Sequence, residues 1–257
     1  MLVVAGITGY GFRFRKGVEL RRGVREVRLM IDRRIFLSLV LGSRVWAEGS
    51  GTVEEKWADE LKRFAEADRK HPPKSGQIVF AGSSSIRLWK LEQSFPDLGV
   101  VNRGFGGSTI PENEALADRL ILPLKPKAVV FYAGDNDLAA KGAEAGRTVE
   151  DFRKFLAALA RGGLRVPLVY IAIKPSISRW KLRSMQQEAN RAIAAICAER
   201  KETMRFVDLD RVMLAGGGEP DPALFEKDGL HVNAAGYERW TPLVRQALRE
   251  LLPGEIP

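Results

Sequence analysis

The sequence has little cysteine and little histidine, and each shortage excludes a kind of site. Its 257 residues include one cysteine and two histidines. Cys197 cannot form a disulfide within the chain, and its place in a predicted helix, residues 190–200, favours a small buried hydrophobic side chain. His71 falls in a linker, which leaves His231 as the one histidine of the folded body. With no cysteine cluster, only carboxylates could complete a metal site, so we expect no metal and no other cofactor.

The sequence also has no long apolar run, no internal repeat and no low-complexity tract. Hydrophobic residues make up 45% and charged residues 28% of the chain. This composition excludes collagen-like, disordered and polytopic membrane proteins. An apolar run at residues 35–41 is far too short to span a bilayer as a helix, so we expect no stable membrane span.

Positive charge is concentrated at the N-terminus. The net charge is +9, but residues 1–47 hold ten basic and three acidic residues, which leaves about +2 for the other 210. A nearly neutral body lacks the basic surface that a phosphate backbone requires. We therefore expect no nucleic-acid partner.

Residues 30–47 have the pattern of a signal peptide. A short basic stretch precedes the apolar run, and Val45 and Ala47 suit a peptidase that cuts before Glu48. Arg33 and Arg34 resemble a twin-arginine signal. We therefore expect export to the periplasm or the exterior. If Met30 is the true start, residues 1–29 are an upstream extension; the alternative is a core strand with basic flanks.

The rest of the chain predicts one α/β domain preceded by a helix. Residues 48–75 are expected to form an amphipathic helix over 53–69 and a linker, and residues 76–257 the domain. There, short apolar runs alternate with helical patterns, which indicates βαβ units and a parallel sheet. The predicted strands are 77–82, 99–102, 127–133, 166–173 and 204–209, and the predicted helices are 111–122, 149–162, 181–200 and 234–251.

Three helix starts carry their own sequence signals. Thr148 with Asp151 reads as a capping box, Pro111 suits a first helical turn, and Asn233 can cap the last helix. Because ligands of such sheets bind at the carboxyl ends of the strands, the loops there are the first places to look for chemistry.

A run of three serines follows the first predicted strand. Ser83, Ser84 and Ser85 come directly after Gly82. A serine on a strand-to-helix turn can present its hydroxyl at the sheet edge while its own N–H points into the same space. A Gly-x-Ser-x-Gly elbow is excluded because Ile86 stands at the second glycine position. Taken alone, the run is more typical of a helix cap or a loop.

Two further loops follow predicted strands and could face a developing negative charge. In residues 102–109, glycines allow close backbone approach, but Thr109 stands at the third glycine position of a dinucleotide fingerprint. The chain has no phosphate-binding Gly-Lys-Ser/Thr loop either. In residues 134–137, the amide of Asn136 could donate to an oxyanion, although a plain turn has the same composition.

A fourth motif, Asp228-Gly-Leu-His231, precedes the last predicted helix. His231 is the one plausible imidazole base in the body of the chain. A carboxylate three residues before a histidine can fix the tautomer of the ring and stabilise its charged form.

In order and spacing, these four motifs resemble the blocks of the SGNH (GDSL-type) hydrolase superfamily over residues 77–251. The resemblance implies a three-layer α/β/α sandwich around a flavodoxin-like, five-stranded parallel sheet. It also implies a triad and an oxyanion hole. The implied triad is Ser84, Asp228 and His231, and the implied oxyanion donors are the Ser84 N–H, the Gly107 N–H and the Asn136 side chain.

The sequence departs from the superfamily at two positions. Ser83 replaces the usual aspartate before the nucleophile, and Ser108 replaces an aspartate that often follows the oxyanion glycine. Neither belongs to the triad, so we expect activity. Alignment on Gly82 selects Ser84 among the three serines.

The resemblance implies a serine esterase that acts through an acyl-enzyme. We expect short acyl groups, such as acetyl, on a glycan or another polar small molecule. A lysophospholipase, an acyltransferase and a catalytically silent glycan-binding protein stay open as alternatives. The oligomeric state and the natural ester are not predicted.

Overall fold

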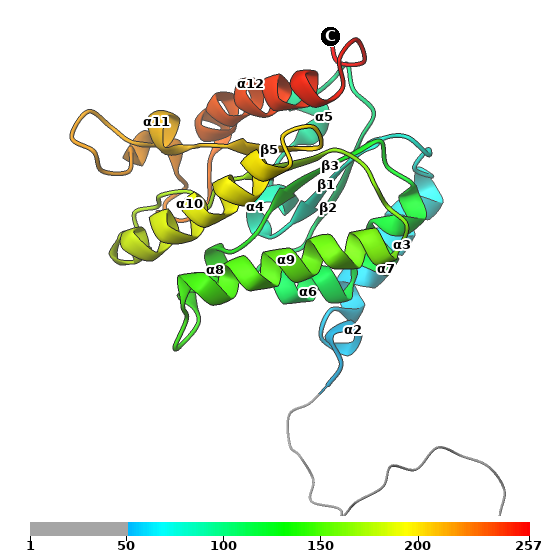
Figure 1. Cartoon of the computed structure of the whole chain (residues 1–257), viewed down its shortest axis with the longest axis horizontal. Coiled ribbons are helices and arrows are strands. Elements are labelled where there is room, and N and C mark those ends of the chain that lie inside the picture. The colour runs from blue at the N-terminus through cyan, green and yellow to red at the C-terminus, as the bar shows by residue number, and fades with distance from the viewer. Residues whose placement is uncertain (1–50) are drawn as a thin grey trace, which may run out of the picture. The chain divides into compact units, whose positions relative to one another are not determined.

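The computed structural model describes residues 51–257. The expected signal peptide and its upstream extension, residues 1–47, lie outside the described residues. At its centre is a five-stranded parallel sheet with the strand order β2-β1-β3-β4-β5 (Figure 1). This is the order of flavodoxin-like doubly wound folds. The strands are β1 Ile78–Gly82, β2 Val100–Gly104, β3 Ala128–Tyr132, β4 Leu168–Ile171 and β5 Met204–Val207.

Helices cover both faces of the sheet (Figure 1). On one face lie α5 (Leu91–Ser94), α11 (Asp210–Met213) and α12 (Ala234–Leu251). The other face carries α3 (Ala58–Lys70), α6 (Ile110–Ala115), α7 (Ala117–Leu120), α9 (Ala145–Arg161) and α10 (Arg183–Glu199). The shorter elements are α2 Val53–Lys56, α4 Ser84–Arg87, α8 Asp135–Ala139 and the 3₁₀ turns η1 Leu122–Leu124, η2 Trp180–Leu182 and η3 Pro222–Leu224.

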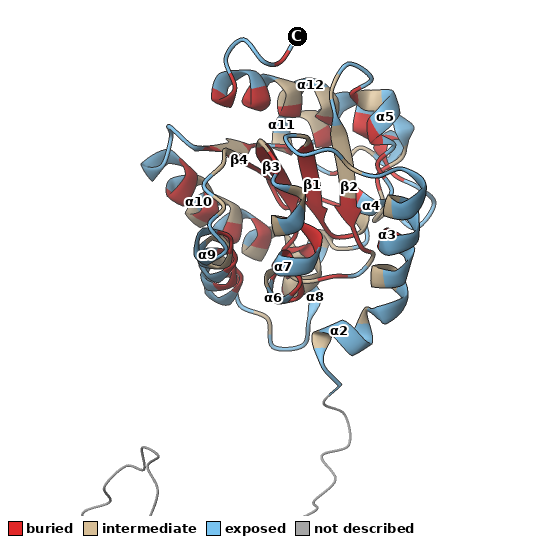
Figure 2. Ribbon diagram, turned by 90° about the vertical axis from the view of Figure 1, so that its right-hand side faces the viewer, coloured by how far each residue is buried: buried red, intermediate tan, exposed pale blue. Residues whose placement is uncertain are grey.

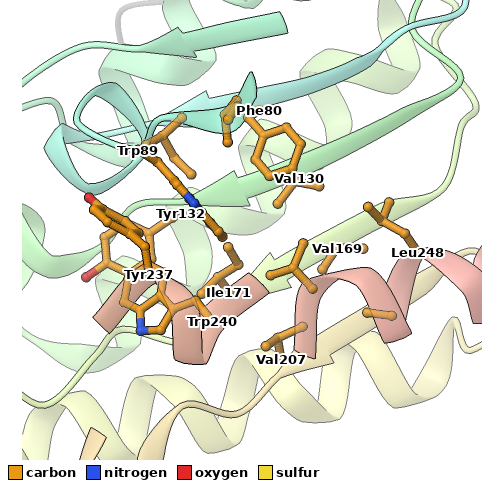
Figure 3. Close-up of a cluster of buried hydrophobic side chains, with 14 of the residues drawn as sticks. Phe80, Trp89, Val130, Tyr132, Val169, Ile171, Val207, Tyr237, Trp240 and Leu248 are labelled. Atoms are coloured by element: carbon orange, nitrogen blue, oxygen red, sulfur yellow. The ribbon is translucent and has the colours of Figure 1, made fainter. Parts of the chain in front are cut away.

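The three central strands, β1, β3 and β4, are buried along their whole length, which explains their continuous apolar sequences (Figure 2). Successive residues of β3 point to opposite sides, so Val130 joins the core under α12, whereas Phe131 joins the core under α9. In the first of these cores, Trp240 of α12 packs on Tyr132 and Trp89, with its indole ring fully buried (Figure 3). The predicted three-layer α/β/α sandwich is confirmed.

Several local predictions also agree with the structure. Pro111 lies in the first turn of α6, and the Asn233 side chain accepts a hydrogen bond from Gly236 N–H at the start of α12. Cys197 is buried, and burial raises the pKa of its thiol to about 12. None of the helices formed by residues 51–257 combines the length and the apolar character needed to cross a membrane.

Two of the predicted helices are interrupted in the structure. The helix expected over 53–69 is broken at Trp57. The indole ring of Trp57 packs on the ring of Phe105, with the ring centroids 4.8 Å apart. The helix expected over 111–122 is broken at Leu116, where burial of the side chain overrides the helical pattern.

The capping box predicted at Thr148 is wrong, because α9 already begins at Ala145. Thr148 is buried inside the first turn, and its hydroxyl lies 3.5 Å from the Glu144 carbonyl, four residues earlier. That contact is typical of a threonine inside a helix and not of an N-cap.

Candidate active site

Ser84 lies at the carboxyl end of β1, at the first position of α4. The turn depends on Gly82, which has φ +132° and whose added Cβ would lie 1.9 Å from the Tyr132 carbonyl oxygen. Ser83 and Ser85 are each 1% exposed, whereas Ser84 is half-buried. Of the three consecutive serines, Ser84 is therefore the one that presents its hydroxyl at the sheet edge.

The structure brings Ser84, His231 and Asp228 together. Nε2 of His231 lies 3.1 Å from Oγ of Ser84, and Nδ1 of His231 lies 2.5 Å from Oδ2 of Asp228. The loop before α12 delivers both residues, and the Phe225–Val232 bridge closes its base. The imidazole thus has one nitrogen on a carboxylate and the other on a hydroxyl.

The Asp228 carboxylate is held in place by its own loop. Its Oδ1 accepts hydrogen bonds from the backbone N–H groups of Leu230 and His231, both at 2.9 Å. Desolvation raises the pKa of Asp228, but these hydrogen bonds and the contact with the His231 ring outweigh it and lower the pKa to about 2. The carboxylate is therefore ionised throughout the neutral range.

The loop after β2 is fastened to the end of β1, two residues before the serine. Gly107 is exposed with φ +83°, a conformation that glycine adopts without strain. The next residue fixes the loop, because the Ser108 hydroxyl donates to the Gly82 carbonyl at 3.2 Å and accepts from Asn113 Nδ2 at 3.1 Å. Ser108, one of the two departures from the superfamily pattern, thus fastens this loop to the end of β1.

Asn136 lies in the first turn of α8, directly after β3, rather than in a plain turn. Its Nδ2 donates to the Ser108 carbonyl at 2.9 Å, and its Oδ1 accepts from Arg179 Nη2 at 3.0 Å. Because an amide nitrogen carries two hydrogens, a second donor remains on Nδ2.

A buried ionic cluster lies next to Asn136. Asp135 is 4% exposed and contacts Lys174 Nζ and Arg179 Nη1, each at 2.8 Å. Tyr132 joins the cluster through its hydroxyl, 3.1 Å from Lys174 Nζ and 3.3 Å from Asp135 Oδ2. Burial alone would raise the pKa of Asp135, but the charges of Lys174 and Arg179 hold it below its ordinary value.

Sequence reasoning missed Lys174 and Arg179. Both follow β4, far along the chain from residues 134–137, and neither belongs to a motif. The one signal was Lys174 itself, a charged residue directly after the apolar run 168–173.

Asp137, the last residue of the same motif, supports α6 instead of facing the serine. Its Oδ1 accepts a hydrogen bond from Ile110 N–H at 2.9 Å, at the first residue of that helix. Desolvation by burial raises the pKa of Asp137 to about 6. Among residues 51–257, no group of three or more His, Cys, Asp or Glu side chains is arranged to hold a metal ion.

Comparison with known families agrees with this geometry. Residues 81–239 match the model of the GDSL-like lipase/acylhydrolase family. The chain belongs to this family. The match covers more than half of the sequence and includes Ser84, Gly107, Asn136, Asp228 and His231. As a member of a family of acylhydrolases, the protein is a carboxylic ester hydrolase.

Solved structures with the same fold include three bacterial proteins. A GDSL-like lipase from Bacteroides thetaiotaomicron is 20% identical with a TM-score of 0.62, over 75% of this chain and 98% of that one. A lipase/acylhydrolase from Enterococcus faecalis is 18% identical with a TM-score of 0.57, over 68% and 95% of the two chains. A catalytic mutant of an acetylxylan esterase from Geobacillus stearothermophilus is also 18% identical, with a TM-score of 0.55, over 70% and 95%. At these identities the likeness concerns the fold. Comparison with curated protein sequences gives no match.

Proposed function

We propose that the protein hydrolyses esters through an acyl-enzyme on Ser84, with His231 as general base and Asp228 as the carboxylate that orients it. The observation that supports this best is the 3.1 Å distance from His231 Nε2 to Ser84 Oγ, with Asp228 on the other ring nitrogen. A nucleophile, a base and a group that orients the base form the arrangement that activates a serine hydroxyl.

In the proposed first step, Ser84 Oγ attacks the ester carbonyl carbon while His231 Nε2 takes the hydroxyl proton. The carbonyl electron pair moves to oxygen and forms a tetrahedral oxyanion. When the oxyanion collapses, the bond to the alcohol breaks, and the alcohol takes the proton from the imidazolium. Water then attacks the acyl-enzyme with the same histidine as base and releases the acid and Ser84.

Three donors are proposed to hold the oxyanion: the N–H groups of Ser84 and Gly107 and the side-chain amide of Asn136. The Ser84 N–H lies in the first turn of α4, where a helix offers it no carbonyl partner. Asn136 contributes the hydrogen of Nδ2 that Ser108 does not use. In other acyl-transfer sites, removing one such donor lowers kcat by a factor of about 10² to 10³.

For the substrate, we propose short acyl groups, acetyl first, on a glycan. The acetylxylan esterase from Geobacillus stearothermophilus shares the fold, and the expected export would bring the enzyme to extracellular polysaccharides. A lysophospholipase would instead prefer long acyl chains, and an acyltransferase would prefer an alcohol to water as acceptor.

The test is the hydrolysis of p-nitrophenyl acetate by the parent protein and by Ser84→Ala. We expect Ser84→Ala to lose about 10³-fold or more of kcat, because the nucleophile is gone. Ser83→Ala and Ser85→Ala are matched controls, since both serines are buried beside Ser84 without facing His231. Parent-like hydrolysis by Ser84→Ala would overturn the proposal of an acyl-enzyme on Ser84.

Acyl preference is measured with p-nitrophenyl esters of increasing chain length. Acetyl should be cleaved faster than octanoyl and decanoyl. The reverse order would favour the lysophospholipase alternative, and formation of a new ester in the presence of an added alcohol would favour the acyltransferase.

A further inference from the structure

A groove of about 760 Å³ opens between the segment that follows α4 and the first half of α12, and none of the proposed catalytic residues lines it. One wall is the segment 88–94, which follows α4, and the other is the first half of α12. Trp89 of the first wall and Tyr237 of the second are stacked, with ring centroids 5.1 Å apart (Figure 3).

Lining residues of the groove are bonded to the segments that carry the nucleophile and the base. Leu88, one of its lining residues, donates its backbone N–H to the Ser84 carbonyl at 2.9 Å. The hydroxyl of Tyr237 donates to the carbonyl of Ser85 at 2.8 Å. Val232, another lining residue, directly follows His231 in the chain. The groove thus begins close to the segments that carry the nucleophile and the base, although neither Ser84 nor His231 lines it.

The side of Ser84 on which the groove lies decides which half of an ester it can hold. In acyl transfer, the oxyanion points toward its donors, here Gly107 and Asn136, while the leaving oxygen must approach the protonated base to take its proton. The alcohol half of the ester thus lies on the His231 side, where Val232 and α12 form the groove.

We infer that this groove binds the alcohol half of the ester, and that the alcohol is an uncharged polyol such as the sugar units of a glycan. The inference rests on the proposed esterase function and names the place where the substrate's larger half is recognised.

Apolar side chains make up much of the lining, but the rim of the groove favours a polyol over an acyl chain. The exposed rim carries hydrogen-bonding side chains of both kinds, donors and acceptors. An acyl chain laid over them would desolvate these groups without partners, whereas sugar hydroxyls can both donate to them and accept from them. The exposed rim residues are Lys90, Gln93, Glu226 and Glu238.

The charges of the groove disfavour an anionic alcohol. Glu226 and Glu238 would repel a phosphate, with Lys90 as the opposing charge on the other wall. Arg245, at the far end, is already engaged by Asp97 through two hydrogen bonds of 2.7 Å. A neutral ligand avoids the cost of placing a negative charge beside two carboxylates.

Pro242 adds one more polar group to the same wall. A proline has no N–H, so the carbonyl of Glu238, four residues earlier in α12, lacks its helical hydrogen-bond donor. Both residues line the groove. A backbone acceptor without a helical partner is suited to a hydroxyl donor.

Ala234→Trp tests the groove, because Ala234 is exposed, lines the groove and lies three residues from His231. The matched control is Ala235→Trp, which places the same bulky side chain on the next exposed residue of α12, outside the lining. A gentler pair, Gln93→Ala and Glu238→Ala, removes polar contacts without filling the space.

Two ester series separate the halves of the substrate. The first keeps acetyl and enlarges the alcohol from ethyl acetate to acetylated xylotetraose; the second keeps p-nitrophenol and lengthens the acyl group from acetyl to octanoyl. We expect Ala234→Trp to lower the ratio of kcat/KM for acetylated xylotetraose to that for ethyl acetate by about tenfold or more. The acetyl-to-octanoyl ratio should stay that of the parent. Gln93→Ala and Glu238→Ala should act on the first ratio mainly through KM.

A binding measurement reads the groove without hydrolysis. Calorimetry of unmodified xylotetraose with Ser84→Ala protein should show binding that Ala234→Trp abolishes and Ala235→Trp keeps. A changed acyl-chain ratio in Ala234→Trp would assign the groove to the acyl half and overturn the inference. So would unchanged ratios in both series, or no xylotetraose binding by Ser84→Ala protein. Loss of the proposed function has a different signature, namely p-nitrophenyl acetate hydrolysis that does not depend on Ser84.

Discussion

Arg179 donates from Nη2 to Oδ1 of Asn136 over 3.0 Å, and this hydrogen bond decides which end of the amide can act as a donor. A guanidinium has no acceptor, so the amide oxygen must face Arg179 and the nitrogen must face Ser108. Arg179 is in turn held by Asp135, whose other charged partner is the buried Lys174. The orientation of the proposed oxyanion donor is thus set by charges that lie outside the motif that contains it.

Arg179→Met is expected to lower kcat about tenfold with little change in KM, because the Asn136 amide is then free to rotate away from the oxyanion. Asn136→Ala should cost about 10² to 10³ in kcat. If Arg179 acts through Asn136, the double variant should be no slower than Asn136→Ala alone. The measurement is a double-mutant cycle on kcat with p-nitrophenyl acetate.

Additive losses in that cycle would show that Arg179 acts on catalysis by some other route. Arg179→Lys, which keeps a donor and the charge beside Asp135, should recover part of the lost activity. Lys181→Met serves as the control, since Lys181 is an exposed cation of the same segment.

Asp228→Asn should lower kcat by about 10² to 10⁴ and leave the fold unchanged. The side-chain amide of this variant would keep an oxygen for the N–H groups of Leu230 and His231, so the loop is retained. Its NH₂ group, however, would face His231 Nδ1 and favour the tautomer that carries the proton on Nε2, which cannot accept one from Ser84. Steady-state kinetics measure the loss of kcat, and circular dichroism checks that the variant is folded. A loss below tenfold would mean that Asp228 does not control the tautomer.

The sequence predicts most of this site because its residues lie in short local motifs at strand ends. Ser84, Gly107 and Asn136 each follow a strand whose apolar residues were recognisable, and parallel strands bring their carboxyl ends to one edge. Asp228 and His231 precede a helix with a clear cap at Asn233. Alignment on Gly82 selected Ser84 among the three serines, and the structure agrees with that choice, because Ser83 and Ser85 are buried.

What the sequence could not predict depends on contacts between distant segments. Lys174 and Arg179 become partners of Asp135 because β3 and β4 are neighbours in the sheet, which no local pattern encodes. The break at Leu116 and the early start of α9 at Ala145 have the same origin, since burial determined both. The groove beside α12 likewise joins residues about 140 positions apart.

The predicted signal peptide implies that the exported protein is cleaved. Expressed in a bacterium with its full sequence, the protein should leave the cytoplasm, and its mature N-terminus should be Glu48, because the small residues Val45 and Ala47 precede that bond. Mass spectrometry of the secreted or periplasmic protein identifies that end. Arg33→Lys combined with Arg34→Lys should block export if the twin-arginine route is used. A cytoplasmic protein that keeps residues 30–47 would contradict the signal peptide.

Asp137 predicts a dependence of folding stability on pH. Burial raises its pKa to about 6, above the ordinary value of about 3.9. The unfolded chain therefore loses this proton at lower pH than the folded protein does. The stabilising contribution of the protonated carboxyl is complete below about pH 4 and is lost as the pH rises through about 6.

Asp137→Asn removes that titration while keeping an oxygen for the Ile110 N–H. Its new NH₂ group takes the place of Oδ2, which is buried without a partner, so the variant carries a constant cost at every pH. The informative quantity is therefore the change in unfolding free energy with pH. Between pH 4 and pH 8, the unfolding free energy of the parent should fall by up to about 3 kcal/mol relative to that of Asp137→Asn. Urea unfolding at both pH values measures this, with the exposed Asp118→Asn as control. A difference between Asp137→Asn and the parent that stays constant from pH 4 to pH 8 would mean that Asp137 is not the group that titrates.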